Sequence, residues 1–116
     1  MSEEKKYLYS DLSYYFFKDY LENKYNNNLD QLLKSQLLTR IGANNTTYLP
    51  LKYFHKSKVV PSEIDNYFRQ DTLIGYVHDM GAAMQGGIGG HAGLFSNAND
   101  IAKIMQMFIQ GGNYGS

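Results

Sequence analysis

The chain lacks several features that would reveal a structural or functional class. None of its 116 residues is cysteine, which excludes disulfides and thiolate metal sites. Its apolar runs are a few residues long, whereas a bilayer-spanning helix needs about 20. The first six residues are rich in charge, unlike a signal peptide. Because 11 Lys and Arg residues balance 11 Asp and Glu residues, charge indicates neither a nucleic acid nor a membrane surface as partner.

Aromatic residues are what the chain has in abundance. It contains 11 tyrosines and 6 phenylalanines but no tryptophan, so aromatic residues make up 15% of the sequence. We expect most of these rings to lie in a hydrophobic core. The length fits one domain, and we therefore treat residues 1–116 as a single domain or a domain fragment.

Helical periodicity appears in three segments. Residues 11–25 carry one stripe, formed by Leu12, Tyr15, Phe16 and Tyr20. Residues 29–40 carry one apolar edge, formed by Leu29, Leu32, Leu33 and Leu37, and residues 98–110 carry a third stripe. Asn28 with Gln31, and Asn97 with Asp100, have the spacing of helix-capping residues. A shorter helix is predicted within residues 78–85, ended by two glycines.

The remaining segments show no helical period. Residues 44–61 predict an extended segment with at most short strands, residues 62–65 a short capped turn, and residues 66–75 a loop with one helical turn. The sequence as a whole therefore predicts a mainly α fold with irregular loops.

The glycine-rich segment 84–96 predicts a shaped loop. Glycine adopts positive φ without strain and allows another chain or a ligand to approach closely, and such loops often form sites. Residues 87–92 fit a dinucleotide-binding pattern, but no strand precedes them and no acidic residue follows at the required distance. The histidines at positions 55, 78 and 91 lack metal-ligand spacing. We therefore predict no cofactor and no metal.

Two motifs carry a resemblance to a known family. They are Tyr9-Ser10-Asp11-Leu12 and His91-Ala92-Gly93-Leu94-Phe95-Ser96, with Val77-His78-Asp79 between them. In this order they resemble the beta-lactamase-related serine hydrolases, which include class C beta-lactamases, D-alanyl-D-alanine carboxypeptidases and related esterases. Serine hydrolase domains that follow a glycoside hydrolase domain in bacterial envelope proteins are similar. The resemblance implies the helical subdomain of a beta-lactamase or transpeptidase-like fold.

The resemblance also implies a division of catalytic roles. The family uses a serine with a lysine three residues later, a Tyr-x-Asn motif, and a downstream Lys-Thr-Gly or His-x-Gly strand. Tyr9 matches the tyrosine and becomes the candidate general base, while Asp11 stands at the asparagine position. Ser2 and Lys5 have the serine-lysine spacing, but they lie in a charged segment four residues before the tyrosine motif, and we regard that match as chance.

The glycine-rich segment contributes further site candidates. Gly90, His91 and Gly93 are candidate substrate-loop residues by the resemblance. His91 has two interpretations: it lines the edge of the site, or it ties the loop to backbone carbonyls, which we favour. Asp11 and Ser10 equally have the side chains preferred at helix starts.

Three functions follow from these patterns. The first is a part of a serine hydrolase that acts by acyl transfer on an amide or ester, such as a cell-wall peptide or a beta-lactam, and that is inactive alone. The others are a non-catalytic helical interaction domain and a degenerate domain retained for binding. The expected partners are a small-molecule or peptide substrate, the remaining parts of the hydrolase domain, and a second copy through exposed apolar surface. By resemblance, the parent protein belongs in the periplasm or cell envelope.

Overall fold

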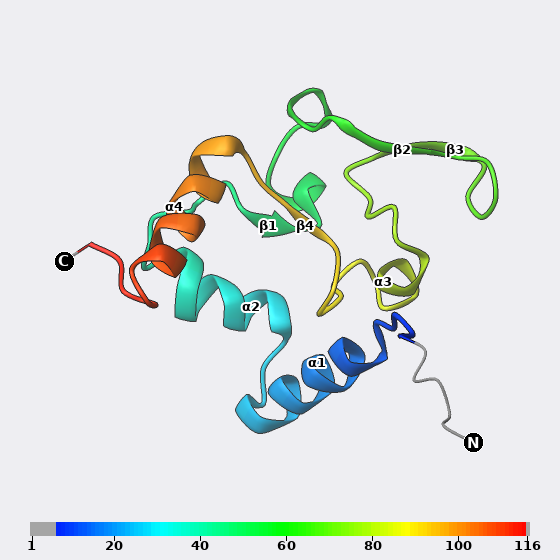
Figure 1. Ribbon diagram of the computed structural model, residues 1–116. Coiled ribbons are helices and arrows are strands. Elements are labelled where there is room, and N and C mark those ends of the chain that lie inside the picture. Colours follow the sequence, from blue (N-terminus) through cyan, green and yellow to red (C-terminus); the bar gives the residue numbers. More distant parts are fainter. Residues whose placement is uncertain (1–6, 116) are drawn as a thin grey trace, which may run out of the picture.

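The computed structural model describes residues 7–115, so the Ser2 and Lys5 pair lies outside the described residues. Helix α1 covers Leu12–Tyr25, and α2 covers Leu29–Leu33 and continues as a π-helical turn over Lys34–Leu38. The short α3 covers Met80–Met84, and α4 covers Ala98–Ile109. These bounds confirm the predicted helices, and Figure 1 shows α2 and α4 side by side. No helix among residues 7–115 is long and apolar enough to cross a membrane.

The two predicted capping pairs differ in outcome. The Asn97 side chain accepts a hydrogen bond from the Asp100 amide at 2.9 Å, as its spacing predicted. Asn28 makes no side-chain cap, and the Leu29 amide instead donates to Glu22 Oε1 at 2.8 Å. A carboxylate from the preceding helix therefore replaces the predicted capping box.

The main hydrophobic core lies between α2 and α4. Its buried residues are Leu38, Ile41 and Ala43, against which Leu33, Leu37, Ile104 and Met107 pack. The π-helical turn, in which the Thr39 amide donates to the Lys34 carbonyl at 3.0 Å, shifts the helical phase and turns Leu38 inward. Sequence periodicity placed Leu37 at the end of this edge and missed Leu38.

A buried carboxylate fixes the loop that follows the core. Asp100 is fully buried and accepts hydrogen bonds from the Asn45 amide at 2.7 Å and from Lys103 Nζ at 3.3 Å. Lys103 also donates to the Gly42 carbonyl. Because both oxygens of Asp100 have partners, this buried charge links α4 to residues 42–45.

Helix α1 packs through a side of mixed polarity. The half-buried residues there are Asp11, Tyr15, Lys18, Leu21 and Glu22, whereas Leu12, Phe16 and Tyr20 of the predicted stripe are 55%, 68% and 58% exposed. None of the residues of α1 is buried. The expectation that this aromatic stripe lies in the core is therefore wrong for the chain as described.

Two small antiparallel sheets complete the fold. Strand β1, Thr47–Tyr48, pairs with β4, Leu94–Phe95, and strand β2, Pro61–Asp65, pairs with β3, Asp71–Ile74. The predicted mainly α fold is therefore wrong, and the chain is a small mixed α/β structure. The prediction of short strands within residues 44–61 is confirmed, with 3-10 turns at Pro50–Lys52 and Lys56–Lys58.

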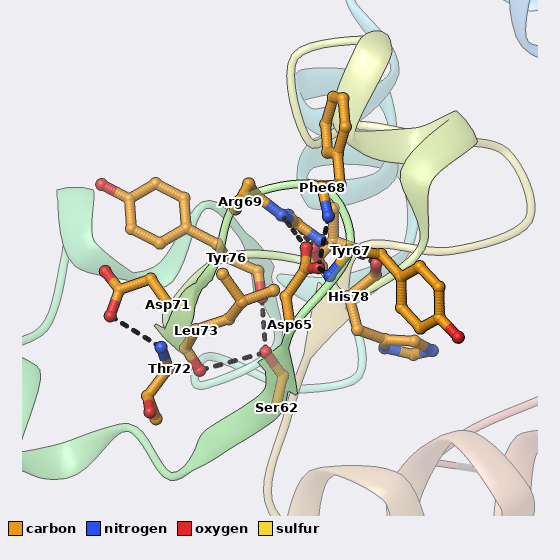
Figure 2. A network of polar contacts seen from close by, with 11 residues as sticks. Ser62, Asp65, Tyr67, Phe68, Arg69, Asp71, Thr72, Leu73, Tyr76 and His78 are labelled. Carbon is orange, nitrogen blue, oxygen red and sulfur yellow. Dashed lines mark hydrogen bonds and ion pairs between the residues drawn. The ribbon is translucent and has the colours of Figure 1, made fainter.

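The β2–β3 hairpin replaces the turn and loop predicted for residues 62–75. It extends from the rest of the chain in Figure 1, and four of the five residues of β2 are exposed. A hairpin with so little burial has no alternation of apolar and polar residues for the sequence to display. Side-chain hydrogen bonds hold its turn, and Figure 2 shows them converging on Asp65.

Candidate functional site

The start of α1 places the tyrosine motif at one end of the helix. Tyr9 donates a hydrogen bond from its hydroxyl to Asp11 Oδ1 at 3.0 Å. The Leu12 amide donates to Ser10 Oγ at 3.3 Å, whereas Asp11 makes no capping bond. The Asp11 carboxylate is therefore held by the phenol and remains available for other contacts.

A second carboxylate reaches the same place from α3. Asp79 is the N-cap of that helix, and its Oδ1 accepts from the Ala82 amide at 2.7 Å. The same oxygen lies 2.8 Å from His91 Nε2. The His91 side chain, which we expected to meet backbone carbonyls, is only 6% exposed and pairs with this carboxylate instead.

Three side chains from distant segments meet here. One ligating atom each of Asp11, Asp79 and His91 lies within 4.8 Å of the other two. In Figure 1 the start of α1 lies beside α3, in agreement with this cluster. The fold thus brings the tyrosine motif and the glycine-rich segment together. Asp79 was missed as a site residue, although its place before a short helix marks it as a cap.

Close packing holds the glycine-rich segment against α1. A Cβ on Gly90 would lie 2.5 Å from the Tyr14 carbonyl oxygen, so only glycine fits there without displacement. The Tyr15 ring lies 4.9 Å from the His91 ring, centroid to centroid. Of the predicted loop residues, Gly90 and His91 therefore contact α1, whereas Gly93 packs against Tyr48 near β4.

The hydrogen bonds at the two carboxylates lower the pKa of Asp79 and raise the pKa of Tyr9. The Ala82 amide hydrogen bond, aided by the bond to His91, holds the pKa of Asp79 below its usual range against the opposing effect of burial. The hydrogen bond to Asp11, and then the charge of Asp11, raise the pKa of Tyr9. At neutral pH this arrangement keeps Asp79 ionised and Tyr9 protonated.

A groove of about 430 Å³ borders the glycine-rich segment. Its lining includes Tyr48, His78, Gly90 and His91. The Tyr48 hydroxyl donates to the Gly89 carbonyl at 2.8 Å, and burial raises the pKa of Tyr48 to about 12. The Tyr48 phenol therefore remains a hydrogen-bond donor at neutral pH and holds the Gly89 carbonyl in place.

Replacing Tyr48 with phenylalanine is expected to lower the free energy of unfolding by about 1 kcal/mol, because the buried Gly89 carbonyl loses its donor. Urea unfolding followed by circular dichroism measures the change. Tyr53→Phe is the matched control, since Tyr53 is 49% exposed and its hydroxyl has no hydrogen-bond partner within residues 7–115. Equal effects of the two substitutions would contradict this role of Tyr48.

The other two histidines lie outside the cluster. His55 contacts Ser57 at the start of a 3-10 turn, and the His78 carbonyl accepts a hydrogen bond from Arg69. Neither belongs to the Asp11, Asp79 and His91 cluster.

Two curated relatives of this chain carry the same name. A protein of Escherichia coli K12 is 34% identical over 122 residues, which are 95% of this chain, and is named "Putative D-alanyl-D-alanine carboxypeptidase". A protein of Salmonella agona with the same name is 33% identical over 123 residues, or 96% of the chain. The chain spans 28% of the length of each of these relatives.

No family model and no solved structure matches the chain. The evidence for its family is therefore the alignment with these relatives, which includes both motifs because it covers nearly the whole chain. This alignment confirms the predicted resemblance: homologues at ~33% identity over 95% of this chain carry a carboxypeptidase name, which is consistent with the beta-lactamase-related serine hydrolase family.

Proposed function

We propose that this chain is part of a serine hydrolase that acts by acyl transfer on an amide or ester, with a cell-wall peptide or a beta-lactam-like compound as substrate. The name of the relatives supports a peptide ending in D-alanine as the substrate class. We further propose that residues 1–116 act as one part of that hydrolase domain and are inactive alone.

The observation that carries the proposal is the placement of Tyr9 and Asp11 beside the glycine-rich segment. Tyr9 is 73% exposed, and its hydroxyl is held at 3.0 Å from Asp11. Once its own proton is removed, an exposed and oriented tyrosine at this position can receive a proton from a serine supplied by another segment. Gly90 and His91 then form the adjacent wall of the site.

The proposed base needs a cation that the described residues do not place there. Asp11 raises the pKa of Tyr9, whereas a phenol acts as a base near neutral pH only when positive charge stabilises the phenolate. Within residues 7–115, no Lys or Arg forms an ion pair with Asp11. In the proposed enzyme, the lysine of the nucleophile segment supplies this charge.

A chimeric protein tests the proposal. The chain replaces the matching segment of the Escherichia coli relative, and acylation by a fluorescent beta-lactam or a fluorophosphonate is followed by intact mass. We expect no adduct on the isolated chain and an adduct on the chimera, with Tyr9→Phe slowing acylation at least about 100-fold. Tyr7→Phe, two residues away and 90% exposed, is the control.

Two outcomes would overturn the proposal. An adduct on a serine of the isolated chain would show that it needs no other segment. Equal acylation rates for Tyr9→Phe and Tyr7→Phe would remove the base role from Tyr9. The unmodified relative serves as the positive control for the probe.

The exposed apolar side of α1 favours a second candidate, a non-catalytic interaction domain. Leu12, Phe16 and Tyr20 form a stripe that the rest of residues 7–115 leaves uncovered. Concentration-dependent self-association in sedimentation velocity, together with a chimera that cannot be acylated, would favour this candidate over the hydrolase.

A further inference from the structure

Three side chains with metal-binding chemistry gather at the start of α1. Asp11 precedes that helix, Asp79 precedes α3, and His91 lies in the glycine-rich segment. They are separated by 68 and 12 positions in the sequence, so no ligand spacing announces the cluster. The tertiary packing of α1 on α3 and the glycine-rich segment creates it.

The geometry suits a single ion. Zinc bonds to nitrogen and carboxylate oxygen are about 2.0–2.2 Å, so two ligands on one ion lie roughly 3 to 4.4 Å apart. The three candidate atoms lie within 4.8 Å of one another. Asp11 makes no helix-capping bond, so only its hydrogen bond from Tyr9 restrains its carboxylate from moving closer to the other two ligands.

The two carboxylates of the cluster lack a lysine or arginine partner among the described residues, and only Asp79 pairs with His91. Within residues 7–115, neither Asp11 nor Asp79 forms an ion pair with Lys or Arg, and the Oδ2 atom of each has no hydrogen-bond partner. Two carboxylates this close repel each other when both are ionised. A divalent cation between them would neutralise both charges.

The histidine is held in place beside the Asp79 carboxylate. Its side chain is 6% exposed, its Nε2 atom faces the Asp79 carboxylate, and the Tyr15 ring packs against it. Its buried Nδ1 atom has no partner in the described part of the chain. Because the ionised Asp79 carboxylate can only accept, the 2.8 Å contact means that Nε2 carries a proton and donates it to Asp79 in the metal-free chain. Binding of an ion at Nε2 therefore requires that proton to move to the unpartnered Nδ1 atom, so that a bond to the ion replaces this hydrogen bond.

We propose that Asp11, Asp79 and His91 bind one divalent transition-metal ion of the Zn²⁺ type. One imidazole nitrogen and two carboxylate oxygens are a donor set that such ions accept, with water in the remaining positions. The tyrosine hydroxyl on Asp11 lies next to this set. The metal site does not depend on the acyl-transfer proposal, because its test requires no enzymatic activity.

Calorimetric titration of the purified chain with ZnCl₂ tests the site. The expected result is saturable binding of one ion per chain, weakened at least about tenfold in Asp11→Asn and in His91→Gln. The matched controls are His78→Gln, beside Asp79 but outside the cluster, and His55→Gln. Both controls are expected to bind zinc as tightly as the unmodified chain.

Each alternative outcome overturns the proposal. These outcomes are no saturable binding, equal affinity of Asp11→Asn and the unmodified chain, and weakening by His78→Gln or His55→Gln. Binding that is unchanged when the chain is unfolded in about 6 M urea would show that the unfolded chain also binds the ion. Circular dichroism of each variant verifies its fold, which Asp11→Asn is expected to keep because Asp11 bonds only to Tyr9 through its side chain.

Discussion

Replacing Gly93 with alanine is expected to lower the free energy of unfolding by about 3 kcal/mol, the combined effect of backbone strain and overpacking. Gly93 has φ of 116°, which side chains rarely allow, and an added Cβ would lie 2.5 Å from the Gly87 carbonyl oxygen. It would also lie 3.2 Å from the Tyr48 ring. The positive φ and the Gly87 carbonyl oxygen both belong to the backbone, so changes of side-chain rotamer cannot relieve them.

Urea unfolding of Gly93→Ala and Gly86→Ala separates the two causes. Gly86 also has positive φ, at 75°, but an added Cβ there meets no atom within 4 Å. We expect Gly86→Ala to lose only about 1 kcal/mol, from strain alone. Similar losses in both variants would show that the contacts of Gly93 with Gly87 and Tyr48 are not important for stability.

The second large effect is expected at the turn of the β2–β3 hairpin. Arg69 donates to Asp65 Oδ2 at 2.8 Å, to the Val77 carbonyl at 2.7 Å and to the His78 carbonyl at 2.8 Å (Figure 2). Arg69→Met leaves a carboxylate and two carbonyls without these donors. We expect a loss of about 2–3 kcal/mol, below the value for fully buried pairs because the Arg69 side chain is 22% exposed.

Urea unfolding at several pH values measures this contribution. The Phe68 amide and the Arg69 side chain hold the pKa of Asp65 well below its usual range. A lowered pKa in the folded state adds stability above the unfolded pKa of about 3.9, and that stability is lost as pH falls below about 4. Arg69→Met removes one cause of the lowering, so its stability is expected to depend less on pH in this range.

Arg40→Met is the matched control for Arg69. Arg40 is exposed and makes one hydrogen bond, of 3.4 Å, to Gln36. We expect a change below about 0.5 kcal/mol. A similarly small effect of Arg69→Met, or an unchanged pH dependence, would contradict the role assigned to the Asp65 and Arg69 pair.

Sequence patterns predicted the helices because their causes are local. The stripe of α4 and the Asn97 cap act over four or fewer positions, and both were confirmed. The π-helical turn that brings Leu38 into the core was missed. The extra residue of this turn changes the helical phase. That change becomes favourable only when Leu38 is buried in the core against which Ile104 and Met107 pack.

The predicted mainly α fold was wrong because side-chain hydrogen bonds, rather than apolar burial, hold the β2–β3 hairpin. The β2–β3 hairpin buries few residues, and its turn is held by Asp65 and Arg69 rather than by a glycine turn. The β1–β4 pair joins residues 47–48 to residues 94–95, and only two residues of each take part. Such short and distant pairing leaves no periodic pattern in either segment.

By itself, the sequence determined the helices, the need for bare backbone in the glycine-rich segment, and the resemblance to the beta-lactamase-related serine hydrolases. The tertiary structure decided which side chains meet. It placed Asp79 beside Asp11 and His91, and it turned α1 so that Leu12 and Phe16 remain exposed. The physical reason is range: propensity, capping and positive φ act between neighbours in sequence, whereas the cluster depends on packing between segments far apart in the chain.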